Sequence, residues 1–187
     1  IVVAFYAHPV GDDYCESAKV LELGFWTSQK YWYENFSGRY FSFLLRSSYP
    51  FIANSLGDYF TVYKFVPLIL LPSLFLGIAF LLRSFLAFAL PKDKVPQVKD
   101  IIWATLTIYA IYLTRIPSNL EYFYWLSGAL VHAVPSILLL LLLALMLWAR
   151  NLPDSLSVSR KSLYFLLCGL IAIAQAGSNE IAAPSFD

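Results

Sequence analysis

The stretch YFYWLSGALVHAVPSILLLLLLALMLW (residues 122–148) decides the fold, because it contains no acidic residue, lysine or arginine over its whole length. A helix needs about 20 apolar residues to cross the hydrocarbon core of a bilayer. The whole chain has the same character: 59% of its 187 residues are hydrophobic and 13% are charged, whereas soluble domains carry about 25% charged residues. The sequence therefore predicts an all-α, polytopic transmembrane protein.

Apolar runs on both sides of this stretch predict further spans and the loops that join them. We expect membrane spans at 59–90, 97–114, 120–149 and 162–176, loops at 91–100 and 150–161, the end of an earlier helix at 1–7, and a long polar loop at 8–58. Aromatic and aliphatic residues in the long loop predict two amphipathic helices that lie on the membrane surface. Both ends of the chain look like cuts in a longer protein, so we expect 1–187 to be a fragment forming one transmembrane domain.

The distribution of basic residues predicts the orientation of these loops. Lysine and arginine are denser in loops 91–100 and 150–161 than in 8–58 and 115–125. Because cytoplasmic loops of membrane proteins are enriched in basic residues, the first two loops are expected to be cytoplasmic and the other two external. The net charge of +1 gives no reason to expect nucleic-acid binding.

The sharpest chemical feature is the pair of adjacent carboxylates at Asp12 and Asp13, directly after the apolar stub and the helix-breaking residues 8–11. Ionisable groups at a membrane boundary are costly to place and indicate a functional site. One acid could serve as a general base and the other could bind a cation. In the alternative interpretation, Asp12 or Asp13 simply N-caps a helix that starts near Tyr14. Adjacent residues on a helix point about 100° apart, so the two acids share one site only where the backbone is irregular.

Other charged residues on the predicted external face are candidates for substrate binding. Arg39 offers a planar fork suited to phosphate or carboxylate, although an arginine that reaches toward lipid headgroups fits the pattern equally well. No second histidine or cysteine is spaced to join His8 and the two acids, so the pattern predicts no metal site. The remaining candidates are Lys64, Arg115, Glu121 and Glu180.

Taken together, these residues resemble the GT-C superfamily of polytopic glycosyltransferases that use polyprenyl-phosphate-linked sugars, and in particular a related group of bacterial multi-spanning proteins. Gly11-Asp12-Asp13-Tyr14 is similar to the acidic motif that follows the first membrane helix in that superfamily. Gly38-Arg39-Tyr40 looks like the Gly-Arg motif of its external loops, with Phe36 where the family often has tryptophan. Residues 121–125 and 177–180 resemble recurring external motifs, and family members usually have more spans than this chain.

The resemblance implies a membrane glycosyltransferase of the cell envelope, acting at the external or periplasmic face of the bacterial inner membrane. Asp12 or Asp13 would deprotonate or orient an acceptor hydroxyl, and Arg39, Arg115 or Lys64 would stabilise the charge that develops on the departing phosphate. The implied partners are a lipid-linked sugar donor and membrane lipids. Relatives with monophosphate donors need no metal whereas oligosaccharide transferases use a divalent ion, so Mg²⁺ or Mn²⁺ stays an open alternative.

A second interpretation is a non-enzymatic membrane protein, either part of a transporter or a structural subunit in a complex with other membrane subunits. Transporters place broken helices and ionisable groups near the middle of the membrane. Pro67, Pro72 and Pro135 lie inside predicted spans and keep this alternative open, whereas the acids lie at the boundary of the membrane and argue against it.

Overall fold

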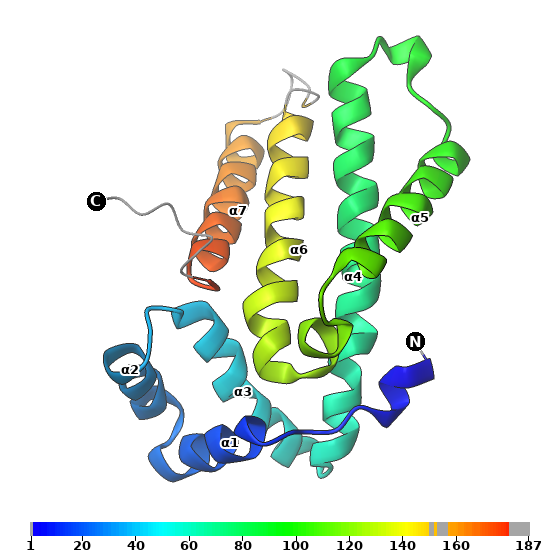
Figure 1. Ribbon diagram of the computed structural model, residues 1–187. Coiled ribbons are helices and arrows are strands. Elements are labelled where there is room, and N and C mark those ends of the chain that lie inside the picture. Colours follow the sequence, from blue (N-terminus) through cyan, green and yellow to red (C-terminus); the bar gives the residue numbers. More distant parts are fainter. Residues whose placement is uncertain (1, 150–151, 153–156, 180–187) are drawn as a thin grey trace. The chain divides into compact units, whose positions relative to one another are not determined.

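The computed structural model describes residues 2–149, 152 and 157–179, and this part of the chain is helical without a strand (Figure 1). Its elements are η1 (Val2–Tyr6), α1 (Asp12–Leu23), α2 (Phe25–Asn35), α3 (Tyr40–Leu56), α4 (Tyr59–Ala89), η2 (Lys92–Lys94), α5 (Val98–Arg115), η3 (Leu120–Tyr124), α6 (Leu126–Trp148) and α7 (Val158–Ala176). The elements η1 and η2 are 3₁₀ helices, and η3 is a single π-helical turn. The all-α prediction is confirmed.

Among the described residues, three helices are long and apolar enough to cross a membrane, namely α4, α6 and α7. This finding indicates an integral membrane protein. The span expected at 97–114 forms a helix, α5, that does not meet the same criterion. Lys99, Asp100 and Arg115 lie at the two ends of α5, so the apolar part between them is too short.

The helices α4 and α6 continue without interruption through the three prolines on which the transporter interpretation rested. Pro67 and Pro72 lie inside α4, and Pro135 lies inside α6. The broken helices typical of transporters are therefore not formed at these positions.

The N-terminal 58 residues differ in detail from their predicted structure. The apolar stub forms a 3₁₀ helix over Val2–Tyr6 where the end of an α-helix was expected. Three helices, α1 to α3, occupy the loop in which two surface helices were expected. Gly24 separates α1 from α2 with a φ of 79°, in the left-handed region that favours glycine, and so adds a helix boundary to this loop.

The chain forms two compact units. The first unit comprises 1–71, 117–135 and 174–187, and the second comprises 72–116 and 136–173. Three segments that are distant in the sequence therefore build the first unit, which contains most of the predicted site residues.

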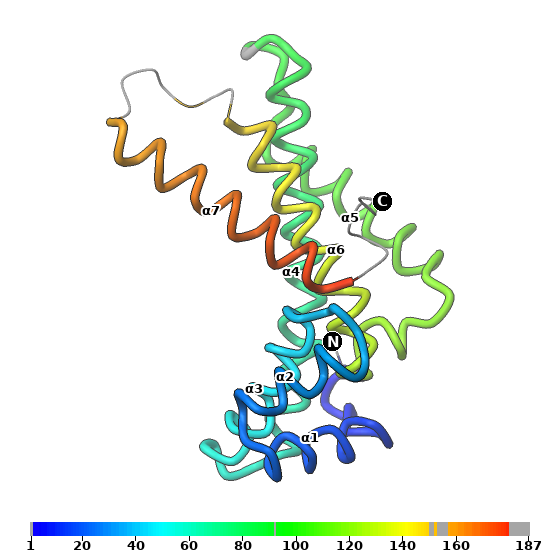
Figure 2. The backbone as a smooth tube through the Cα atoms, turned by 90° about the vertical axis from the view of Figure 1, so that its left-hand side faces the viewer, coloured from blue at the N-terminus to red at the C-terminus, as the bar shows by residue number. Residues whose placement is uncertain are grey.

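Within the first unit, α1, α2 and α3 lie against one another (Figure 2). The core of this unit contains the side chains of Ala7, Tyr49, Ala53, Tyr63, Leu126 and Leu130. The first turn of α3 is held by the chain after α7, because the Phe41 N–H donates to the Gly177 carbonyl at 2.8 Å. A Cβ at Gly177 would lie 2.3 Å from the Tyr40 ring, so a larger residue at this position requires the ring to move.

The second unit is held by contacts between apolar helix faces. Gly77 of α4 packs against α6, where a Cβ would lie 3.4 Å from the Leu140 side chain. Phe75 and Tyr109 meet edge to face with ring centroids 5.7 Å apart. These contacts join α4 to α6 and to α5 inside this unit.

Candidate functional site

The two adjacent acids have different environments. Asp13 is only 2% exposed, whereas Asp12 is exposed to solvent. Both lie in the first turn of α1, whose N-cap is Gly11 with no side-chain capping bond. The capping interpretation is therefore wrong in its register, because the helix begins at Asp12 and not near Tyr14. The divergence of about 100° between neighbouring helical residues directs one carboxylate inward and the other outward.

Asp13 accepts three hydrogen bonds that fix the start of α1. Its Oδ2 accepts from the Tyr63 hydroxyl at 2.7 Å and from the Val10 N–H at 3.1 Å, and its Oδ1 accepts from the Ser127 hydroxyl at 3.0 Å. The Tyr63 hydroxyl in turn accepts from the Leu126 N–H at 2.8 Å. Hydrogen bonds to an ionised group contribute about 1.5–3 kcal/mol each. Asp13 therefore joins α1, α4 and α6 within the first unit.

A buried ion pair lies next to this network. The Arg46 guanidinium donates to Glu16 Oε1 at 2.5 Å, and the exposed fractions of the two side chains are 10% and 14%. The Ser127 hydroxyl lies 3.3 Å from Glu16 Oε2 as well as 3.0 Å from Asp13. Ser127 thus connects the ion pair to the buried acid.

Burial and charge act in opposite directions on this pair. Burial raises the pKa of Glu16 above its ordinary value, while the charge of Arg46 and the Ser127 hydrogen bond oppose that rise. Burial likewise lowers the pKa of Arg46, and the negative charges of Glu16, Asp13 and Asp12 counteract it. Desolvation disfavours the charged form of both groups, so each charge depends on its partner.

The charge cluster consists of Asp12, Asp13, Glu16, Arg39 and Arg46, which influence one another electrostatically. Arg39 directly precedes α3 and lies near enough to Arg46 to lower its pKa further. The cluster brings three of the predicted site residues together, and its negative groups exceed its positive ones by one. It is the best-organised group of titratable side chains in the first unit.

The other predicted site residues lie outside this cluster. Lys64 is half-buried in α4, and its charge adds to the lowering of the pKa of Asp58, which is caused first by the side-chain hydrogen bond from Thr61. Arg115 is the exposed last residue of α5 in the second unit. Glu180 lies outside the described residues.

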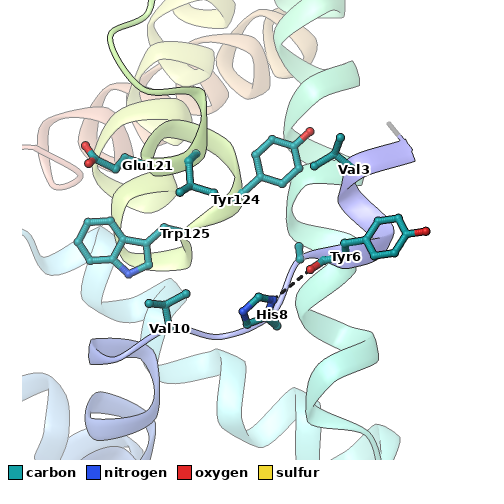
Figure 3. A pocket seen from close by; sticks show the side chains of 9 residues that line it. Val3, Tyr6, His8, Val10, Glu121, Tyr124 and Trp125 are labelled. Atoms are coloured by element: carbon teal, nitrogen blue, oxygen red, sulfur yellow. Dashed lines mark hydrogen bonds between the residues drawn. The ribbon is translucent and has the colours of Figure 1, made fainter.

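Glu121 lies in the η3 turn and lines a cavity of about 360 Å³ within the first unit. The lining is formed by the N-terminal segment and by η3 with the residue that follows it, namely Val3, Tyr6, Ala7, His8, Val10, Leu120, Glu121, Tyr124 and Trp125 (Figure 3). Neither Asp12 nor Asp13 belongs to the lining, so the cavity and the charge cluster are separate features.

A close contact holds the η3 turn in place. A Cβ at Gly128, in the first turn of α6, would lie 2.2 Å from the Glu121 carbonyl oxygen and 3.0 Å from the Trp125 ring. Only glycine fits at this distance. Single π-helical turns occur frequently at functional sites, and this one places both Glu121 and Trp125 at the cavity.

The described residues contain no group of three or more histidine, cysteine or acidic side chains arranged to hold a metal ion. The Nδ1 of His8 bonds to the Tyr6 carbonyl at 3.1 Å. Asp13 and Glu16 direct their oxygens to hydroxyl, backbone and guanidinium donors. The described acids therefore supply no geometry through which a divalent cation could be assigned.

Sequence reasoning missed Arg46, Tyr63 and Ser127 as partners of the acids. Arg46 carries a detectable signal, because it interrupts the apolar segment FSFLL (residues 41–45) and charged residues are rarely buried without a partner. Tyr63 and Ser127 carry none, since hydroxyl residues are common in such helices.

Comparison of this chain with protein-family models, with curated proteins and with solved structures finds no match. The site is therefore interpreted from its own geometry.

Proposed function

We propose that this protein is a membrane glycosyltransferase that transfers a sugar from a polyprenyl-phosphate donor to a hydroxyl acceptor. The observation that carries the proposal is the division of roles between the two adjacent acids. Asp13 is buried and fixes the first turn of α1, while Asp12 is exposed beside the Arg46 charge. A carboxylate held on a rigid element is suited to accept a proton at a fixed position.

In the proposed reaction, the Asp12 carboxylate accepts the proton of the acceptor hydroxyl. The hydroxyl oxygen then forms a bond to the anomeric carbon of the sugar, and the bond between that carbon and the phosphate oxygen breaks. The polyprenyl phosphate leaves with the electron pair of that bond. Arg39, at the edge of the charge cluster, is the cation proposed to stabilise the departing phosphate, because its planar guanidinium suits phosphate oxygens.

We also propose that the reaction takes place at the external face of a bacterial inner membrane. The support for this placement is the low density of basic residues in 8–58, which contains the charge cluster, relative to 91–100 and 150–161.

The proposal is tested with purified protein in liposomes, a polyprenyl-phosphate donor carrying a radiolabelled hexose, and octyl glucoside as the acceptor. We expect labelled product to form together with free polyprenyl phosphate. Asp12→Asn should lower the rate about 10²- to 10⁴-fold, the contribution of a general base. The matched control is Glu22→Gln, which changes an exposed carboxylate of the same helix that is paired with Lys19. Equal rates for wild type and Asp12→Asn would refute the assignment.

A structural subunit of a membrane complex is the second candidate, and one specific observation favours it. Arg46 donates to Glu16, and the Ser127 hydroxyl lies within hydrogen-bond distance of both Glu16 and Asp13. Such a network also serves to hold helices together. If the protein is a structural subunit, the variants of the cluster have the same sugar transfer as the wild type, and Arg46 variants release partner subunits from the purified complex.

A further inference from the structure

We infer that Glu16 and Ser127 form a pH-sensitive switch, which fastens α1 to the first turn of α6 while Glu16 is protonated. Glu16 lies in α1 and Ser127 at the start of α6, and both residues belong to the first unit. The switch needs no substrate and therefore operates independently of the proposed sugar transfer.

One hydroxyl hydrogen has to serve two carboxylates. The Ser127 hydroxyl lies 3.0 Å from Asp13 Oδ1 and 3.3 Å from Glu16 Oε2, and a serine hydroxyl has a single hydrogen to donate. Hydrogen bonds between oxygens span up to about 3.0 Å, a range that includes the contact with Asp13 and not the contact with Glu16. The hydrogen therefore belongs to Asp13, and at Glu16 two oxygens face each other without a hydrogen between them.

Protonation of Glu16 at Oε2 supplies the missing hydrogen. The carboxyl group then donates to Ser127, which still donates to Asp13, so that both contacts become hydrogen bonds. Glu16 Oε1 continues to accept from the Arg46 guanidinium, 2.5 Å away. When the proton leaves, the hydrogen bond from Glu16 to Ser127 is lost, and α1 is held less firmly against α6.

The direction in which Ser127 donates decides its effect on Glu16. A hydroxyl that donates to Oε2 stabilises the ionised carboxylate and opposes the rise in the pKa of Glu16. A hydroxyl that donates to Asp13 accepts from the protonated carboxyl group and favours the uncharged form instead. The shorter distance to Asp13 selects the second arrangement.

The charge balance of the cluster also favours a proton on Glu16. Three acids, Asp12, Asp13 and Glu16, act on two arginines, Arg39 and Arg46, so one proton makes the cluster neutral. The Glu16 side chain is only 14% exposed, and a buried charge without compensation is strongly unfavourable. Burial is accordingly the largest influence on Glu16 and raises its pKa.

Other titratable groups on the helices packed against α1 have partners elsewhere. The exposed ion pairs of α1 and α2 are each neutral, and the tyrosine hydroxyls of α3 and α4 bond to other groups. These residues are Lys19 with Glu22 and Lys30 with Glu34, Tyr49 with the Tyr59 carbonyl, Tyr59 with Ser17, Tyr63 with Asp13, Lys64 acting on Asp58, and His132 of α6 stacked on Tyr122.

The switch is tested on the intact protein in liposomes by infrared spectroscopy, which detects the carbonyl stretch of a protonated carboxyl group. The difference between the spectra of wild type and Glu16→Gln isolates the band of Glu16. As the pH is raised, we expect this band to disappear with a midpoint above 4.5, the ordinary value for this group.

Two variants separate the shared hydroxyl from the effect of charge. Asp12→Asn and Asp13→Asn each remove one negative charge that raises the pKa of Glu16, and the influence of Asp12 is the larger of the two. Only the amide of Asp13→Asn donates to Ser127 and so turns the hydroxyl hydrogen toward Glu16. Asp13→Asn should therefore lower the midpoint by about one pH unit more than Asp12→Asn does, as expected for one hydrogen bond.

The fastening of α1 is measured by hydrogen–deuterium exchange of its backbone amides, corrected for the intrinsic dependence of exchange on pH. In wild type, α1 should exchange faster above the midpoint than below it, because local opening becomes easier when a tertiary contact is lost. Glu16→Gln carries a side-chain amide that can donate to Ser127 at every pH, so its exchange should not change across the same range.

A wild-type band that is lost at or below pH 4.5 would overturn the switch. A midpoint shift in Asp13→Asn no larger than that in Asp12→Asn would show an effect of charge alone and would overturn the role of Ser127. Exchange in α1 that stays constant across the midpoint in wild type would overturn the fastening of α1 to α6. These measurements use no sugar donor, so failure of the proposed transfer leaves their outcome unchanged.

Discussion

Replacement of Asp13 by asparagine separates the structural role of this acid from the proposed role of its neighbour. The substitution preserves the size of the side chain but replaces one acceptor oxygen by an amide donor. In the best orientation, the amide oxygen stays with the Tyr63 hydroxyl and the Val10 N–H, the two donors that bond to Oδ2. The amide nitrogen then faces Ser127, whose hydroxyl can accept from it while donating to Glu16.

The magnitude follows from these bonds. A hydrogen bond to an ionised group is worth about 1 kcal/mol more than one between neutral groups, and two such bonds become neutral in Asp13→Asn. We therefore expect the free energy of unfolding to fall by about 2 kcal/mol. Asp13→Ala removes all three bonds and should lower it by about 4 kcal/mol. Asp12→Asn, at the exposed neighbour, should change it by less than about 0.5 kcal/mol.

The assay is unfolding of the purified protein in detergent micelles by increasing sodium dodecyl sulfate, followed by helical circular dichroism. Wild type, Asp12→Asn, Asp13→Asn and Asp13→Ala are compared under one set of conditions. The reasoning is refuted if Asp13→Asn unfolds at the same denaturant concentration as wild type, or if Asp12→Asn is destabilised to the same extent.

Three further predictions concern the ion pair and the close contact at α6. Arg46→Gln leaves the buried Glu16 carboxylate without its partner and should lower the free energy of unfolding by about 3 kcal/mol. Lys19→Gln breaks an exposed ion pair and should lower it by less than about 1 kcal/mol. Denaturant titration of both variants checks this contrast. The folded-state pKa of Glu16 is raised above 4.5. The contribution of this group to stability is therefore fully present below that pH and is lost as the pH rises through the folded-state pKa. In unfolding titrations above pH 4.5, the free energy of unfolding should decline with pH in the wild type, and this decline should be absent in Glu16→Gln. Gly128→Ala should lower the melting temperature through a steric clash worth about 2 kcal/mol, because its Cβ would meet the Glu121 carbonyl oxygen. Gly169→Ala, with no neighbour within 4 Å, should be neutral or slightly stabilising. An unaltered melting temperature of the Gly128→Ala protein would contradict the packing described.

The helices that can cross a membrane follow from composition, because long apolar runs have few stable alternatives to a helix. The helix at α5 was predicted to within one residue, but whether it spans a membrane could not be decided in this way, since charged residues at both of its ends leave its apolar part marginal in length. The division of the N-terminal loop into α1 and α2 depends on Gly24, whose positive φ is a conformation that glycine permits but does not impose.

The identity of the buried acid was not predictable from the sequence. The helical angle between neighbours implies that Asp12 and Asp13 face different ways, but not which of them faces inward. That choice depends on Tyr63 and Ser127, which lie 50 and 114 residues away along the chain. Such distant partners leave no trace in a local sequence pattern, so only the fold identifies them.

The most direct test of the account measures sugar transfer and unfolding on the same preparations of wild type and Asp12→Asn. We predict that Asp12→Asn unfolds at the wild-type denaturant concentration, because this side chain is exposed, and that it transfers hexose from the polyprenyl-phosphate donor about 10²- to 10⁴-fold more slowly. A folded Asp12→Asn protein that transfers the sugar at the wild-type rate would contradict the account.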